Sequence, residues 1–333
     1  MIFQPQETAY PIIISVHLGS VHLKIEGGLG NQLFELAAGY YLAAKLDMNL
    51  KIDQYSIPLS TAHGEKKNGF EEFSIDFNSK ERKIDVSGKL PSPFTIKLAQ
   101  SSPTLKRIFI KKHKILSNNR FIRNFYEERS EDSALKILQI EKPMNLYGNF
   151  QSWAIVEEAA KLGFPRILQL RKIPYWMNKV EHKIDIKKSL VMHFRVGRDA
   201  IHNENFRQPS VAYYERALAL IDQSKKFKEV FILTDSFANL QLMYPKIVKL
   251  NLQVIEMPSQ ASPAERLFFL SQFGGIICAN STFCGWAAWS IYNSGGEVIV
   301  PVPYSDSYVP GSRHFPSSWI RLCKNTGIEL SDC

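Results

Sequence analysis

The stretch Ser189–Asp199, SLVMHFRVGRD, joins an apolar run to a charged end. The apolar run predicts a buried strand, and the charged end places His193, Arg195, Arg198 and Asp199 near its carboxyl terminus. In open α/β sheets, ligands bind in the crevice outside the carboxyl ends of the strands. Because the planar guanidinium of arginine suits phosphate, the stretch predicts a site for an anionic ligand. A strand that ends in a solvated, salt-bridged loop is the alternative.

The chain that follows alternates predicted strands with predicted helices of about ten residues. The strands are expected at 190–194, 230–234, 252–255, 276–279 and 298–302, and the helices at 213–221, 238–244, 263–273 and 283–292. This alternation predicts a parallel, doubly wound sheet with right-handed crossovers. The second half of the chain is therefore expected to be a Rossmann-like α/β domain.

A strand, a glycine turn and a helix are predicted near the start of the chain. Apolar and polar residues alternate over 21–25, Gly27, Gly28 and Gly30 form the turn, and apolar residues then recur at helical spacing. Such a turn lets the backbone approach a ligand closely, and a helix N-terminus favours negative charge. Asn31 and Gln32 are expected to hydrogen-bond a sugar or phosphate oxygen. The alternative for Asn31 is a simple N-cap.

The glycine turn does not match the dinucleotide fingerprint GxGxxG. Leu33 stands where the third glycine or alanine is required. An NAD-dependent oxidoreductase is therefore disfavoured.

Three strand ends of the second half carry polar side chains: 193–199, Asp235-Ser236, and Asn280-Ser281-Thr282. Hydroxyls and backbone N–H groups at a helix start form an anion site. Together with Arg195, the group Asn280-Ser281-Thr282 is expected to hold a pyrophosphate. Asp235 is expected to bind a base or a ribose. The aromatic residues in 286–289 are expected to be core, because their helical spacing faces the sheet.

Composition places the chain among ordinary globular proteins. The 333 residues, 45% hydrophobic and 22% charged, predict about two domains. The net charge of +9 is compatible with nucleic acid, a membrane surface or a small anion. Nucleic acid is the least supported, since no basic tail, zinc-finger spacing or aromatic RNA-binding signature occurs.

A cytoplasmic location is expected from the cysteines and the N-terminal segment. The four cysteines form no CxxC pair, which favours free thiols. The apolar run 11–18 is too short to span a bilayer, and no basic n-region precedes it. The segment Lys106–Lys114, KRIFIKKHK, interleaves basic and apolar residues. Peripheral membrane contact and a solvated helix face are both compatible with this segment.

Three motifs in the same order resemble a known family. GGLGNQLFELAAGYYLA at 27–43, HFRVGRD at 193–199 and NSTFCGWAAW at 280–289 resemble the α-1,2-fucosyltransferases of glycosyltransferase family 11. FILTDS at 231–236 and YGNFQS at 147–152 add to the resemblance, which is thin between about 55 and 145. The family's usual pattern is HxRRxD, whereas Val196 follows Arg195 here and Asp199 comes one residue late. This HxRxGxD variant resembles the protein O-fucosyltransferases, so the linkage formed is left open.

The resemblance implies a GT-B-like fold of two Rossmann-type domains facing across a cleft. Residues 1–185 would form the acceptor side and 186–333 the domain that binds the nucleotide sugar. The implied reaction is inverting transfer of L-fucose from GDP-fucose to a glycan hydroxyl, α-1,2 to a terminal galactose, in surface glycan or O-antigen synthesis. No cofactor and no metal are implied.

The resemblance also implies roles for individual residues. Arg195 would hold the pyrophosphate, supported by His193 and Asp199, while Arg198 either replaces the family's second arginine or points to solvent. The remaining donor contacts would come from Asp235, Asn280, Ser281, Thr282 and Phe283 in the second half, and from Gly28, Gly30, Asn31 and Gln32 in the first.

The chemistry of transfer agrees with a basic site. Negative charge grows on GDP as the bond from sugar to phosphate breaks, so positive groups aimed at the phosphate lower the barrier. The chain contains no DxD pair, which often holds a metal in such enzymes, so arginine is expected to take this role. Glu26, Asp53, Glu71 and Asp199 are all candidates for the base. A non-catalytic protein that binds nucleotides or glycans is the remaining alternative.

Overall fold

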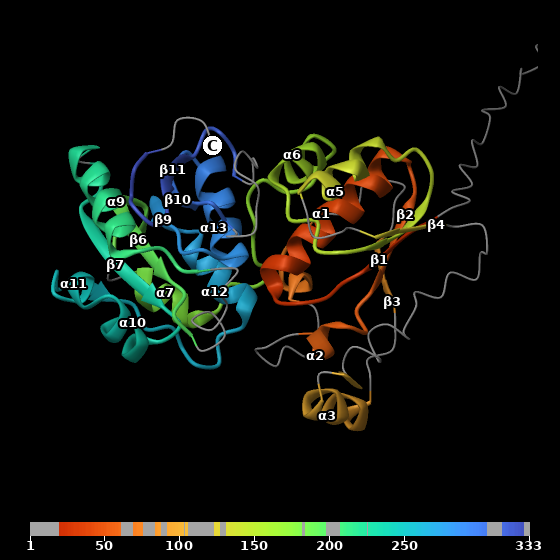
Figure 1. Cartoon of the computed structure of the whole chain (residues 1–333), viewed down its shortest axis with the longest axis horizontal. Coiled ribbons are helices and arrows are strands. Elements are labelled where there is room, and N and C mark those ends of the chain that lie inside the picture. The colour runs from red at the N-terminus through yellow and green to blue at the C-terminus, as the bar shows by residue number, and fades with distance from the viewer. Residues whose placement is uncertain are drawn as a thin grey trace, which may run out of the picture.

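Two parallel sheets, one in each half of the chain, form the framework of the molecule (Figure 1). The structure is a computed structural model. It describes residues 20–60, 69–75, 84–87, 92–102, 104–105, 123–126, 131–181, 184–197, 207–224, 226–304 and 315–329. Lys106–Lys114, Arg198 and Asp199 lie outside the described residues, so the predictions made for them are not tested. The domain boundary at 185 also stays a prediction.

The first sheet has the strand order β3-β2-β1-β5-β4, with every pairing parallel. Its strands are β1 (Ser20–Lys24), β2 (Asn49–Asp53), β3 (Ile84–Ser87), β4 (Arg123–Tyr126) and β5 (Met144–Tyr147). The helices are α1 (Leu29–Lys45), α2 (Ile57–Ser60), α3 (Pro93–Ser101), α5 (Glu131–Leu135) and α6 (Trp153–Lys161), with short 3-10 turns η1 (Phe70–Glu72) and η2 (Lys136–Gln139).

The predicted strand, glycine turn and helix are confirmed as β1 and α1. Val21 and Leu23 are fully buried in the core, whereas His22 between them is only half-buried. This difference between the two faces of β1 explains the alternation in its sequence. The helix begins earlier than the N-cap prediction for Asn31 requires: its N-cap is Gly28, and Asn31 lies in its first turn.

The second sheet has the order β11-β10-β9-β6-β7-β8, again entirely parallel. Its strands are β6 (Ser189–Phe194), β7 (Glu229–Thr234), β8 (Gln253–Val254), β9 (Gly275–Ile277), β10 (Glu297–Val302) and β11 (Ile320–Cys323). Its helices are α9 (Val211–Ser224), α10 (Phe237–Met243), α11 (Pro245–Val248), α12 (Pro263–Leu270) and α13 (Thr282–Asn293), preceded by α7 (Tyr175–Glu181) and the turn η3 (Ile186–Lys188).

The predicted doubly wound domain is confirmed by this order. Every residue of β6 is buried, and β6 lies between β7 and β9. The chain therefore runs outward from β6 in both directions, which places the ends of β6, β7 and β9 side by side. In such sheets the reversal of strand order is where ligands bind.

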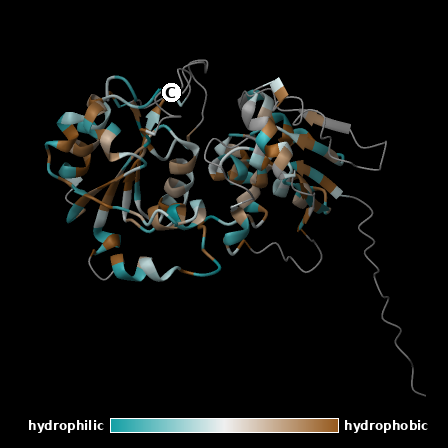
Figure 2. Cartoon of the chain, turned by 90° about the horizontal axis from the view of Figure 1, so that it is seen from below, coloured by the Kyte–Doolittle hydropathy of each residue, from teal (hydrophilic) through white to brown (hydrophobic). Residues whose placement is uncertain are grey.

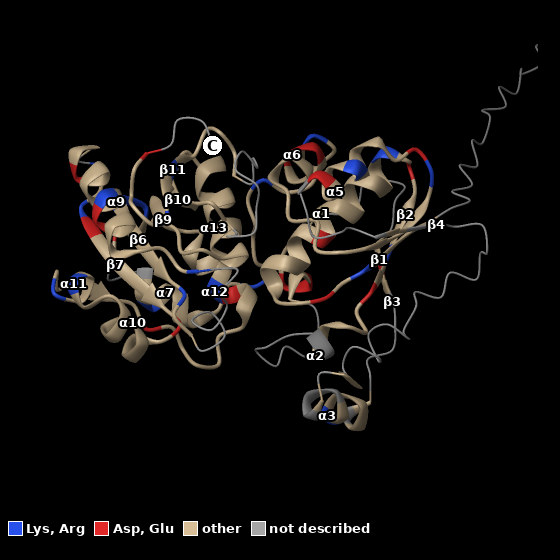
Figure 3. Ribbon diagram, viewed as in Figure 1, with Lys and Arg blue, Asp and Glu red and all other residues tan. Residues whose placement is uncertain are grey.

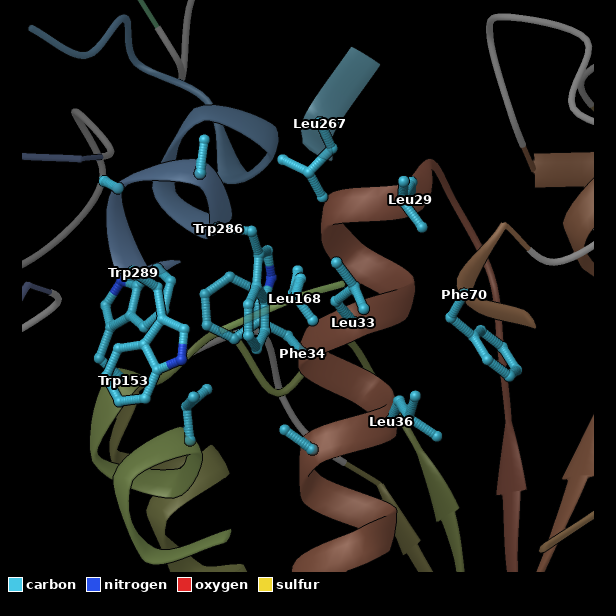
Figure 4. Close-up of a cluster of buried hydrophobic side chains, with 14 of the residues drawn as sticks. Leu29, Leu33, Phe34, Leu36, Phe70, Trp153, Leu168, Leu267, Trp286 and Trp289 are labelled. Carbon is cyan, nitrogen blue, oxygen red and sulfur yellow. The ribbon is translucent and has the colours of Figure 1, made fainter. Parts of the chain in front are cut away.

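An aromatic cluster joins the two halves of the chain. Phe34 of α1, Trp153 of α6, and Trp286 and Trp289 of α13 pack together (Figure 4). Trp153 stacks on Trp289 with ring centroids 5.5 Å apart, and Phe34 meets Trp153 edge-on at 4.9 Å. Figure 2 shows that hydrophobic residues gather along the strands, while many helices carry hydrophobic and hydrophilic residues together. The prediction that the tryptophans of α13 are core residues is confirmed.

Two further observations concern the helices and the cysteines of the described residues. No helix in the described part of the chain is both long and apolar enough to cross a membrane. Cys278, Cys284 and Cys323 are free thiols, and Cys333 lies outside the described residues.

Replacing Trp153 by alanine is expected to lower the free energy of unfolding by about 3–5 kcal/mol, the usual cost of removing a buried aromatic side chain. Trp153 is 2% exposed and contacts aromatic rings of both halves. Urea unfolding followed by circular dichroism measures the effect, with Tyr175→Ala, at a residue 73% exposed, as the control. Equal midpoints for the two variants would contradict the importance of the aromatic cluster.

Candidate functional site

The first turn of α1 and the first turn of α13 touch at backbone distance. A Cβ atom added at Gly30 would lie 2.6 Å from the backbone nitrogen of Phe283 and 2.6 Å from Oγ1 of Thr282. The indole N–H of Trp286 donates a hydrogen bond of 2.9 Å to the carbonyl of Gly30. Only glycine therefore fits at position 30, and the glycine turn of the first half lies against the start of α13.

Asn31 connects three elements at this contact. Its Oδ1 accepts hydrogen bonds from Oγ1 of Thr282 at 3.0 Å and from Nε2 of Gln151 at 3.1 Å. The amide therefore joins α1 to α13 and to the segment before α6, instead of capping its own helix. Gln151 belongs to the YGNFQS stretch at 147–152.

Arg195 lies just beyond β6 and points to the start of α13. Its Nη1 donates a hydrogen bond of 3.3 Å to Oγ of Ser281, the N-cap residue of α13. The Ser281 hydroxyl makes no capping hydrogen bond to its own helix. The structure thus brings together two of the predicted groups, the guanidinium after β6 and the hydroxyl at the helix start. N–H groups in the first turn of a helix and the helix dipole both attract anions.

Asp235 holds the segment that carries Arg195. Its Oδ1 accepts a hydrogen bond of 2.7 Å from the backbone N–H of Val196. Nδ2 of Asn239 donates a hydrogen bond to the carbonyl of Val196, also at 2.7 Å. Asp235 remains exposed. Only a ligand role was predicted for it from the sequence, so its hydrogen bond to the backbone of Val196 is an additional finding. Asn239 was missed, because a single amide inside a short helix carries no signal in the sequence.

Asn280 uses its side chain to hold neighbouring backbone. Its Nδ2 donates to the carbonyls of Tyr304 at 2.7 Å and Arg207 at 3.0 Å, and the residue is 3% exposed. Nε2 of Gln208 donates in turn to the carbonyl of Asn280 at 3.3 Å. These bonds position the ends of two loops beside Ser281. Sequence analysis placed Asn280 among the donor-binding residues and did not single out Gln208 or Tyr304.

Gln32 is fully buried within the first half. Its Nε2 donates to the carbonyl of Gly27 at 2.9 Å, and its Oε1 accepts from the backbone N–H of Gly69 at 3.0 Å. The side chain therefore fixes the shape of the glycine turn and ties it to the segment that leads into η1. The same turn places Gly28 at the N-cap of α1.

His193 and two cysteines lie behind the start of α13. The His193 ring is 7% exposed and lies parallel to Phe283 at 6.3 Å, and Tyr214 donates to the carbonyl of His193 at 3.2 Å. Burial acts to raise the pKa of the Cys284 thiol, but Cys278 and His193 outweigh it and lower that pKa to about 6. Burial raises the pKa of Cys278. His193 is thus a buried side chain packed against Phe283.

Charged residues gather where β1 leads into α1 (Figure 3). Nζ of Lys24 lies 3.9 Å from Oε2 of Glu26, and Asp53 ends the adjacent strand β2. Burial lowers the pKa of Lys24, while the charges of Glu26, Asp53 and Glu35 act to raise it. Across the residues that the structure describes, no three His, Cys, Asp or Glu side chains are grouped to hold a metal ion.

Comparison with known proteins adds to this geometry. The chain is 23% identical over 301 residues to WbnK, an O-antigen biosynthesis glycosyltransferase of Escherichia coli, covering 84% of this chain and 92% of WbnK. No protein-family model matches the chain.

The fold resembles solved fucosyltransferases. NodZ, an α-1,6-fucosyltransferase of Bradyrhizobium soaked with GDP-fucose, matches with a TM-score of 0.50 and 18% identity, covering 82% of this chain and 92% of NodZ. POFUT1 in complex with GDP-fucose has a TM-score of 0.41 and 12% identity, over 82% of this chain and 94% of POFUT1.

Sequence and fold together indicate a glycosyltransferase. The match to WbnK extends over most of both chains, and the fold is the GT-B-like α/β fold of two parallel sheets. The predicted fold class is confirmed. The assignment to family 11 stays a prediction, since no family model matches.

Gly30→Ala is expected to lower the free energy of unfolding by about 1–3 kcal/mol, the usual cost of overpacking. The added methyl group would meet backbone of α13, which cannot move aside as a side chain can. Gly69→Ala is a matched control, because the nearest atoms to its methyl group would all belong to the flexible side chain of Leu29, the closest at 3.1 Å. Thermal unfolding of both variants checks this, and an undisturbed Gly30→Ala would contradict the close contact between α1 and α13.

Proposed function

We propose that this chain is an inverting fucosyltransferase that moves L-fucose from GDP-fucose to a hydroxyl group of a glycan. The observation that carries the proposal is the hydrogen bond from Arg195 to Ser281 at the N-terminus of α13. It sets a guanidinium and a helix start side by side at the reversal point of the second sheet. That arrangement suits a pyrophosphate. The GDP-fucose soaked into NodZ, which has the same fold, supports the choice of donor.

The geometry suggests how the barrier would be lowered. As the bond from fucose to the β-phosphate breaks, negative charge grows on GDP, and Arg195 with the first-turn N–H groups of α13 would stabilise it. The Ser281 hydroxyl is neutral, so its hydrogen bond orients the guanidinium without neutralising it. Thr282 and Phe283 would contribute backbone N–H groups.

Supporting roles follow from the contacts of the remaining residues. Asp235 and Asn280 would position the donor site through the backbone that they hold, and the exposed carboxylate of Asp235 would also reach the ribose. Gly28 and Asn31 would face the donor from the first half, while Gly30 holds the turn against α13 and Gln32 shapes the turn. His193 would support Arg195 from behind. We further propose that Asp199 assists at the ribose and that Arg198 adds a second cation.

We propose a galactose-terminated glycan as the acceptor. WbnK acts in O-antigen biosynthesis, which supports a surface polysaccharide. The α-1,2 linkage is proposed from the resemblance of the three sequence motifs to family 11. Transfer to another position, or from another nucleotide sugar, is the alternative to be distinguished by experiment.

The proposed reaction needs no metal ion, because Arg195 and the start of α13 would take the place of a divalent cation at the phosphates. The purified protein is incubated with GDP-fucose and a panel of β-galactosides in EDTA, and GDP release is followed. NMR of the product identifies the linkage. Failure to bind GDP-fucose would overturn the donor assignment. Binding without transfer to any acceptor of the panel would favour a non-catalytic binding protein.

Arg195→Ala is expected to lower kcat by roughly 10²–10³-fold, the usual effect of removing one preorganised donor to a developing negative charge. Arg195→Lys should recover only part of the rate, because an ammonium group lacks the planar fork. Steady-state GDP release measures both variants. Lys228→Ala, at an exposed lysine beside η3, is the control for loss of positive charge alone. Full activity of Arg195→Ala would contradict the proposed role.

A further inference from the structure

Glu26 lies at the carboxyl edge of the first sheet, directly before the glycine turn. β1 is bounded by β2 on one side and β5 on the other, so the end of β1 is the reversal point of this sheet, as the end of β6 is in the second. Reversal points are where ligands meet open α/β sheets. Four residues further on, Gly30 touches α13. Glu26 therefore lies in the first half, close in sequence to the contact between α1 and α13. Arg195 lies at the same contact, in the second half.

The backbone of Glu26 is held firmly while its side chain keeps access to solvent. Its backbone N–H donates a hydrogen bond of 2.9 Å to Oε2 of the fully buried Glu35. The preceding residue, Ile25, continues the pairing with β2 through a hydrogen bond to the carbonyl of Asp53. The side chain of Glu26 is 27% exposed. A fixed backbone with a reachable carboxylate is what a group that meets a substrate requires.

The other carboxylates near this edge are less accessible or already hold structure. Asp53 is 7% exposed, and its Oδ1 accepts from the backbone N–H of Tyr55. Glu35 is buried and fixes Glu26, and Glu72 accepts a hydrogen bond of 2.6 Å from Ser262 of the second half. Among the described candidates for the base, Asp53 is therefore disfavoured, and the exposed Glu71 lies on η1 and not at a strand end. Glu26 combines access with a place at the reversal point.

Lys24 completes the setting of Glu26. Its ammonium group lies 3.9 Å from Oε2 of Glu26 and 6.0 Å from the centre of the Tyr147 ring on β5. Lys24 is 7% exposed, so its position is fixed by packing. Lys24 therefore orients the Glu26 side chain through this charged contact.

We propose that Glu26 is the general base of the transfer and takes the proton of the acceptor hydroxyl, an inference that rests on the proposed function. In the step, the acceptor oxygen forms a bond to C1 of fucose on the face opposite GDP, and its proton passes to the Glu26 carboxylate. The bond from C1 to the β-phosphate oxygen breaks, and its electron pair leaves with GDP. Glu26 then returns the proton to solvent. The acceptor hydroxyl accordingly binds beside the end of β1.

The test compares Glu26→Gln with the wild type in the acceptor-dependent assay. Loss of a general base typically costs 10²–10⁴-fold, so kcat with the glycan acceptor should fall by about 100-fold or more while the KM for GDP-fucose changes little. Glu26→Asp should keep part of the rate. Glu157→Gln, the same chemical change at an exposed carboxylate of α6, should leave kcat unchanged.

Azide separates a base from a merely structural residue. Azide attacks C1 without losing a proton, so azide-dependent release of GDP should be equal in Glu26→Gln and the wild type. Acceptor-dependent kcat within about threefold of the wild type would overturn the inference. An equal fall in donor binding and in both rates would also overturn it, since that pattern marks a structural role. A wild-type protein that binds no GDP-fucose would instead refute the proposed function.

Discussion

The contact of α1 with α13 at Gly30 is the constraint on which the rest of the site depends. At 2.6 Å from an added Cβ to backbone nitrogen, nothing larger than hydrogen fits between the two first turns. The contact sets the carboxyl edge of the first sheet, with its glycine turn, against the carboxyl edge of the second, with Ser281 and Arg195. The two sheet edges that carry the predicted binding residues are thereby brought together.

The aromatic cluster supplies the stability behind this contact. Trp286 both packs against Phe34 and donates its indole N–H to the carbonyl of Gly30, so one side chain links the apolar core to the polar junction. Trp153 adds a third element, α6, to the cluster. Gln151, two residues before α6, donates a hydrogen bond to Asn31. The polar groups of the junction therefore rest on buried rings and have little freedom to change their spacing. Such preorganisation is what electrostatic stabilisation of a transition state requires.

Local patterns in the sequence predicted β1, α1 and most elements of the second half, but not the elements between about 55 and 145 or the contacts between distant parts. The buried strand β6, the alternation after it and the polar groups at three strand ends follow from short-range periodicity. The bond from Asn31 to Thr282 joins residues 251 positions apart, and nothing in either motif indicates it. The N-cap prediction for Asn31 was wrong because α1 begins at Leu29, with Gly28 as its N-cap. β11, a short strand after a long unpatterned segment, was also missed.

The two edges differ in charge, and this difference suits each half to a separate task in the proposed reaction. The second half offers a guanidinium and a helix N-terminus, two groups suited to the phosphates of the proposed donor and to the charge that would grow on them. The first half offers a carboxylate, Glu26, whose neighbour Lys24 is buried and cannot extend to those phosphates without leaving its packed position. Placing the carboxylate on the opposite sheet separates the proposed base from the cation that is proposed to bind the phosphates.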